Sequence, residues 1–238
     1  MQQQPQGKVD HEILEHYYER LEKNNRFHCF ERKDPEACHH LGNFLETKKK
    51  KFTEAFEVYK DNCMKREYGD SCFQYGQMLY HGTGAEKNIL DAYKAHLQGC
   101  KVKRYNGGSC DTVALHYIDD NIQPEIKKIR GKKDPKKALE LFKKGCDGDD
   151  GMACHHAAVA YKNGIENYVK PDPELMFKYA VKACDFRSKV GCKLVADAYK
   201  SGIGTQKNDR LYEYYQKQYD LMAGRGVARR VDKNSPSK

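Results

Sequence analysis

The ten cysteines are the residues of this 238-residue chain with the clearest capacity for chemistry. They fall into five couples with seven to nine residues inside each: Cys29/Cys38, Cys63/Cys72, Cys100/Cys110, Cys146/Cys154 and Cys184/Cys192. Such couples could form disulfides, bind zinc, act as redox-active dithiols or stay as buried free thiols. The chain has no C-x2-C or C-x4-C zinc spacing and no redox-type C-x-x-C, which leaves disulfides as the favoured reading and free thiols as the main alternative.

Histidines form the second group, because a neutral imidazole can bind a metal or haem iron. His28 lies beside Cys29 and between two phenylalanines, and it is the best single candidate for a haem ligand. Cys-His-His occurs at residues 38–40 and 154–156. Adjacent helical residues point about 100° apart, so we expect these histidines to pack between helices or face solvent rather than share one ion.

One literal match to a serine-nucleophile motif, S-x-x-K, occupies residues 235–238. A nucleophile needs a fixed base and an oxyanion site around it, and we expect no fixed structure at this end of the chain. We therefore predict a chain without catalytic residues.

The elements that carry the cysteines repeat along the chain. Successive couples start 34, 37, 46 and 38 residues apart, a period typical of helical-hairpin solenoids. Four residues after the second cysteine, every unit has glycine or alanine, and apolar or aromatic residues follow the same cysteine at three and seven residues in every unit. These positions share one helical face, and the small residue allows another helix to approach closely.

Helix ends are marked by Gly82, Gly202, Asp134-Pro135 and Asp172-Pro173. We predict helices at residues 9–29, 36–47, 51–64, 70–81, 87–100, 108–119, 134–147, 151–162, 172–184, 189–200 and 206–222, with a basic surface loop at 120–133. The predicted fold is an all-α, right-handed solenoid of about five hairpins after an N-terminal helix. Its repeats span residues 36–69, 70–107, 108–150, 151–188 and 189–222 of a domain at 9–222, between a disordered N-terminus at 1–8 and a basic disordered tail at 223–238.

Each couple places its first cysteine in the last turn of one helix and its second in the first turn of the next. An antiparallel hairpin brings these ends within the roughly 4.4–6.8 Å between Cα atoms that a disulfide requires. Five disulfides would not persist in a reducing cytosol, and the first residues contain no apolar signal segment. The sequence therefore indicates an oxidising compartment reached without a cleaved signal.

Charge and hydropathy limit the partners. The net charge is +9, but aromatic residues are not interleaved with the lysine runs, so we expect no nucleic-acid partner. No stretch approaches the roughly 20 apolar residues of a transmembrane helix. We expect a monomer with no bound cofactor, haem at His28 being the exception.

Three segments carry a family resemblance: residues 75–84 (YGQMLYHGTG), 137–146 (KALELFKKGC) and 196–204 (ADAYKSGIG). They resemble the Sel1-like repeat, a relative of the tetratricopeptide repeat. With a cysteine couple in every unit, the chain resembles the Hcp-like cysteine-rich family. The most specific segment, residues 27–38 (FHCFERKDPEAC), is similar to the mitochondrial branch of that family.

This resemblance implies a protein of the mitochondrial intermembrane space, retained there after oxidation by that compartment's import machinery. It implies a protein-binding scaffold that helps to assemble respiratory-chain complexes, cytochrome c oxidase first and complex I second. The expected partners are complex subunits or other assembly factors. The resemblance also leaves two alternatives, a haem-binding carrier in the same pathway and a β-lactam-binding or hydrolysing enzyme like bacterial members of the family.

Overall fold

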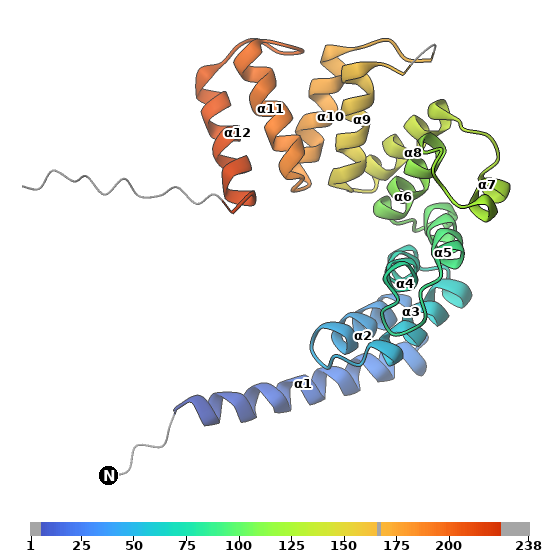
Figure 1. The fold of residues 1–238 in the computed structure, drawn as a ribbon. Coiled ribbons are helices and arrows are strands. Elements are labelled where there is room, and N and C mark those ends of the chain that lie inside the picture. The colour runs from blue at the N-terminus through green and yellow to red at the C-terminus, as the bar shows by residue number, and fades with distance from the viewer. Residues whose placement is uncertain (1–5, 166–167, 225–238) are drawn as a thin grey trace, which may run out of the picture. The chain divides into compact units, whose positions relative to one another are not determined.

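A computed structural model describes residues 6–165 and 168–224, which form twelve α-helices and one isolated antiparallel bridge between Ile165 and Val169 (Figure 1). The all-α prediction is therefore confirmed. The helices are α1 (Gln6–Phe30), α2 (Pro35–Thr47), α3 (Phe52–Arg66), α4 (Gly69–His81), α5 (Ile89–Lys101), α6 (Gly107–Ile118), α7 (Pro124–Arg130), α8 (Pro135–Asp147), α9 (Gly151–Asn163), α10 (Pro173–Asp185), α11 (Lys189–Ser201) and α12 (Asp209–Met222).

The chain divides into two compact units, residues 1–109 with 122–129 and residues 110–121 with 130–238. In the first unit, α1 packs on α2, α2 on α3, α3 on α4 and α4 on α5. In the second unit, the same sequential packing runs from α8 to α12. Each unit is thus a stack of antiparallel helix hairpins, as the repeat predicted.

The column of small residues lies where helices come closest. A Cβ atom added to Gly42 would lie 2.4 Å from Cε1 of the buried Tyr59, and one added to Gly76 would lie 2.8 Å from Cε1 of the buried His96. The alanines at the same position in later repeats, Ala114, Ala158 and Ala196, are fully buried. Close approach therefore explains the choice of glycine or alanine, and His96 belongs to the core.

Helix ends follow the predicted capping chemistry. The carboxylates of Asp134 and Asp172 each accept a hydrogen bond of 2.9 Å from the backbone amide three residues later. Proline follows each of them in the first turn of the helix. Gly82 and Gly202 end α4 and α11 in the left-handed conformation, with φ of 76° and 75°.

The expectation of a surface loop at residues 120–133 is wrong. Residues Pro124–Arg130 form α7, and the side chain of Ile126 is only 1% exposed. Pro124 suits the first helical turn, and the buried isoleucine anchors a segment whose many lysines had suggested a solvated loop.

The first helix begins earlier than we expected. Residues 6–8, which we placed in a disordered N-terminus, are the first turn of α1. Residues 1–5 and 225–238 lie outside the described part, and so does the S-x-x-K motif. The repeat boundaries stay a prediction. Within the described residues, no helix is both long enough and apolar enough to span a bilayer.

Candidate protein-binding groove

The cysteines join neighbouring helices end to end. Four disulfides connect Cys29 to Cys38, Cys63 to Cys72, Cys146 to Cys154 and Cys184 to Cys192, with Cα separations of 4.4–4.6 Å. Cys100 and Cys110 are also in disulfide form, and no cysteine is free. All ten cysteines are buried. The pairing deduced from the spacing is therefore confirmed, and these cysteines are structural rather than reactive.

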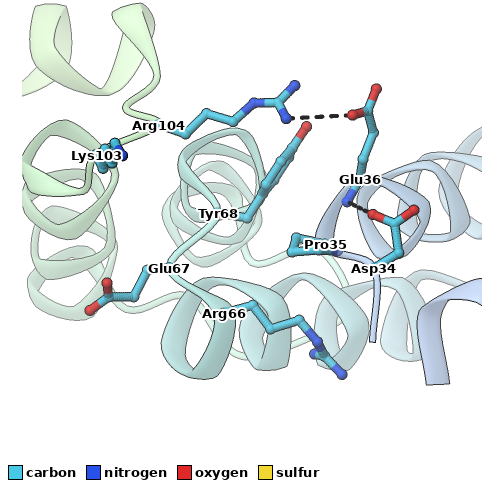
Figure 2. Close-up of a pocket in the computed structure, with 8 residues that line it drawn as sticks. All are labelled: Asp34, Pro35, Glu36, Arg66, Glu67, Tyr68, Lys103 and Arg104. Atoms are coloured by element: carbon cyan, nitrogen blue, oxygen red, sulfur yellow. Dashed lines mark hydrogen bonds and ion pairs between the residues drawn. The ribbon is translucent and has the colours of Figure 1, made fainter. Parts of the chain in front are cut away.

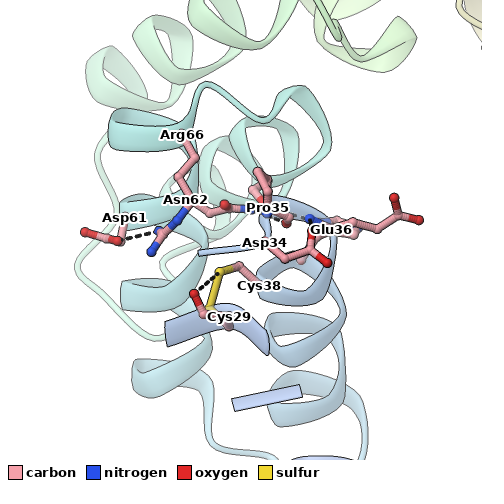
Figure 3. The surroundings of a disulfide bond; sticks show 10 residues. Cys29, Asp34, Pro35, Glu36, Cys38, Asp61, Asn62 and Arg66 are labelled. Atoms are coloured by element: carbon pink, nitrogen blue, oxygen red, sulfur yellow. Dashed lines mark hydrogen bonds and ion pairs between the residues drawn. A yellow bond between two sulfur atoms is a disulfide. The ribbon is translucent and has the colours of Figure 1, made fainter. Parts of the chain in front are cut away.

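A buried amide ties the first two repeats together beside the Cys29–Cys38 bridge. The side-chain nitrogen of Asn62 on α3 donates to the backbone oxygen of Pro35 at 2.8 Å and to the hydroxyl of Ser71 on α4 at 2.7 Å (Figure 3). Asn62 is completely buried. Its backbone oxygen also accepts from the amide of Tyr68 at 3.3 Å. One residue thus fixes the α1–α2 and α3–α4 junctions relative to each other.

These junctions, with the turn after α5, line a groove of about 500 Å³ in the first unit (Figure 2). We call it the junction groove and define it by Asp34, Pro35, Glu36, Arg66, Glu67, Tyr68, Lys103 and Arg104. Every one of these residues lies between the two members of a cysteine couple in the sequence. The groove is therefore built from the loops that the disulfides close.

The wall of the groove formed by the turn after α5 depends on a glycine. The amide of Gly69 donates to the backbone oxygen of Arg104 at 3.2 Å. A Cβ atom on Gly69 would lie only 2.4 Å from that oxygen. Only a residue without a side chain lets the turn after α5 approach the start of α4 so closely.

The junction groove has a charged rim around one aromatic ring. The guanidinium carbon of Arg104 lies 4.9 Å from the ring centroid of Tyr68, a cation–π distance. A terminal nitrogen of Arg104 lies 3.4 Å from a carboxylate oxygen of Glu36 (Figure 2). Three acidic and three basic side chains contribute to the lining. This arrangement suits a polypeptide segment that offers both an apolar surface and charges.

The junction groove offers charged side chains and one phenol. Its only hydroxyl belongs to Tyr68, whose pKa is raised by burial and by the nearby Asp70 carboxylate. The phenol therefore stays protonated at neutral pH and is a poor nucleophile. The eight lining residues include no serine, cysteine or histidine that could form a nucleophile–base pair.

The two Cys-His-His strings serve packing between helices. Nδ1 of His39 lies 3.2 Å from the Ser71 hydroxyl, and its ring lies 5.6 Å from that of Tyr68. Nδ1 of His156 lies 2.7 Å from an oxygen of the buried Asp111. Burial lowers the pKa of His39 and of His155. Among the described residues, no three histidine, cysteine or acidic side chains converge as a metal site would require.

His28 lies in the last turn of α1. Its ring meets the ring of Phe27 edge-on, with centroids 5.5 Å apart. A cavity of about 650 Å³ lies along α1, but Phe27 lines it and His28 does not. A haem in that cavity would not have this imidazole as a wall, and the role of His28 as a haem ligand stays a prediction.

Comparison with known proteins identifies the repeat family and the relatives of this chain. A model of the Sel1 repeat matches residues 69–94, 129–150 and 151–185. The chain is 31% identical over 163 residues to cytochrome c oxidase assembly factor 7 of Mus musculus, covering 68% of each chain. It is 29% identical over 163 residues to the protein of the same name from Homo sapiens, again covering 68% of each.

The fold is also found among solved structures. A Sel1 repeat protein from Oxalobacter formigenes superposes with a TM-score of 0.63 at 19% identity, covering 90% of this chain and 81% of the other. This similarity concerns the fold alone. It agrees with the solenoid of helical hairpins that the sequence predicted.

Proposed function

Since this chain belongs to the cytochrome c oxidase assembly factor 7 family, we propose that it assists the assembly of respiratory-chain complexes, cytochrome c oxidase first and complex I second. We propose that it acts as a non-enzymatic scaffold that binds complex subunits or other assembly factors. The observation that carries this proposal is the junction groove, a preorganised surface with binding groups and without a nucleophile–base pair.

Rigidity supports a binding role. Binding costs less when the surface groups are ordered beforehand, because fewer side chains and loops must be immobilised. Disulfides close the loops that carry Glu36 and Tyr68, and the buried amide of Asn62 links those loops. A partner would therefore meet Tyr68 and Arg104 in positions that already exist in the free protein.

We further propose the mitochondrial intermembrane space as its compartment. Ten buried cysteines in disulfide form require an oxidising environment, and small proteins of reducing compartments keep their thiols reduced. The enzymes of oxidative import in that compartment would be partners during folding. Protease protection of isolated mitochondria, combined with alkylation of the protein before and after reduction, tests this: no thiol should be alkylated before reduction and ten should be alkylated after it.

The scaffold function is tested by rescue. In cells that lack the protein, native gel electrophoresis should show less assembled cytochrome c oxidase, and re-expression of the wild-type chain should restore it. Arg104→Glu should fail to rescue, because the substitution reverses the charge beside Tyr68. Failure of the wild-type chain itself to change the level of the complex would refute the proposed function.

A matched control separates the groove from general surface charge. Lys60 also lies over an aromatic ring, at 5.8 Å from the centroid of Phe56, and 3.6 Å from a carboxylate of Glu57. Its substitution Lys60→Glu removes the same kind of contacts elsewhere in the first unit. We expect Lys60→Glu to rescue fully. Equal rescue by Arg104→Glu would show that partners bind elsewhere.

A further inference from the structure

A second surface feature lies in the other unit and shares no residue with the junction groove. It is an apolar cavity of about 180 Å³ whose walls include Ile118 of α6, Ala138 and Phe142 of α8, and Val159 and Ala160 of α9. His156 is the one titratable side chain in the lining. We call it the α8–α9 pocket.

The wall that contains His156 is held in place. Its Nδ1 lies 2.7 Å from Oδ1 of Asp111, and Asp111 is only 8% exposed. The imidazole also packs on Phe142, with ring centroids 5.0 Å apart. The contacts with Asp111 and Phe142 together fix the position of the imidazole in the wall of the pocket. The cavity therefore exists in the free protein and needs no rearrangement to accept an apolar group.

The volume of the α8–α9 pocket limits the size of the side chain that it can bind. A dry cavity of about 150 Å³ in another protein accommodates benzene. The α8–α9 pocket, at about 180 Å³, has room for one leucine, isoleucine or phenylalanine side chain and for little more.

The charged side chains on the helices that line the pocket favour a partner whose flanking residues are acidic. The two helices that build most of its walls, α8 and α9, carry five lysines and two acidic residues. Lys137 lies over the ring of Tyr117, 4.7 Å from its centroid, next in sequence to the pocket residue Ile118. Lys162 is exposed, one helical turn after Val159. Of the acidic side chains near the α8 wall, Glu140 is exposed between Ala138 and Phe142 in the sequence, and Asp134 accepts a hydrogen bond as a helix cap.

We propose that the α8–α9 pocket binds a single large apolar side chain of an acidic polypeptide segment. The proposal rests on the scaffold function, and it adds a second contact surface with a stated partner chemistry. Burial of the apolar side chain supplies most of the affinity, while Lys137 and Lys162 orient the acidic flanks and accelerate association.

The test uses purified, oxidised protein and a fluorescein-labelled heptapeptide with one central leucine between two blocks of three glutamates. Fluorescence anisotropy should show saturable binding that weakens as salt is raised. Replacing the leucine by alanine should weaken binding about tenfold or more, since a fully buried leucine side chain is lost. Replacing the glutamates by lysines should abolish it.

Protein variants locate the site. Ala160→Leu fills the pocket with a good helix-forming residue and should weaken binding of the leucine peptide at least tenfold. Lys162→Glu should weaken it severalfold without altering the cavity. Lys178→Glu, an exposed charge reversal on α10, is the matched control and should bind like the wild type. Methyl NMR of the wild-type protein should place peptide-induced shifts on Ile118, Ala138 and Val159.

Three results would overturn the proposal: no saturable binding, equal binding of the leucine and alanine peptides, or unchanged binding by both Ala160→Leu and Lys162→Glu. Methyl shifts confined to other residues would overturn it as well. The peptide assay is independent of the rescue experiment. Loss of peptide binding with intact rescue by the wild-type chain refutes only the pocket, whereas failed rescue refutes the scaffold function itself.

Discussion

Removing one disulfide should cost the first unit a calculable amount of stability. The double substitution Cys63→Ala/Cys72→Ala opens a bridge whose members are 9 residues apart in the sequence. The chain-entropy model assigns about 2.5 kcal/mol to closing a loop of this length. The corresponding bridge between Cys184 and Cys192 spans 8 residues, which lowers the calculated value by only about 0.1 kcal/mol. Loss of either bridge should therefore destabilise its own unit by nearly the same amount.

Urea unfolding followed by circular dichroism measures this loss. With a slope of about 1–3 kcal/mol per molar urea, the loss of about 2.5 kcal/mol should lower the midpoint by roughly 0.8–2.5 M. Hydrogen exchange then locates the effect. The Gly69 amide, which donates to the backbone oxygen of Arg104, should exchange faster in Cys63→Ala/Cys72→Ala than in the wild type. In Cys184→Ala/Cys192→Ala the same amide should keep its wild-type rate. Wild-type midpoints in both double variants would refute the view that local bridges stabilise these hairpins.

Three further changes test the packing of the first unit. Gly76→Ala should destabilise it by about 1–3 kcal/mol in urea unfolding, because the new methyl group overlaps the ring of His96. Asn62→Leu should cost about 1–3 kcal/mol by the same measurement, since it leaves the buried Ser71 hydroxyl without the amide donor; a stability equal to wild type would contradict the linking role. Burial lowers the pKa of His39 below its usual 6.5, so the unfolded chain binds a proton more readily, and stability should fall as pH drops below 6.5. In His39→Gln, stability should fall less below pH 6.5 than in the wild type. A pH dependence of stability identical to that of the wild type would contradict this role of His39.

The repeat could be predicted from the sequence because its determinants are local. Gly76 lies four residues after Cys72, and this distance along one helix does not depend on the rest of the fold. The same holds for Asp134 before Pro135, whose capping role involves only three neighbouring residues. The helix α7 was missed because its evidence is tertiary. Ile126 is one apolar residue in a segment rich in lysine, and only its burial shows that the segment packs.

The junction groove could not be predicted by such rules. Tyr68 and Arg104 are 36 residues apart, and their contact depends on the offset between one repeat and the next. One signal did exist in the sequence. Gly69 is the first residue of α4, and a glycine within a helix often marks the close approach of another backbone. The structure identifies that backbone as residue 104.

The position of the groove relates the redox state of the protein to its capacity to bind. Helical-hairpin solenoids can be held by apolar packing alone, and here that packing includes Leu41, Leu45 and Tyr59 in the first unit. The bridges add something that packing does not supply, because they constrain the loops at the helix junctions rather than the helix faces. The groove consists of those loops: Glu36 lies inside the first cysteine couple and Tyr68 inside the second. Oxidation therefore orders the binding residues before any partner arrives, and the reduced chain would bear the cost of ordering them during binding.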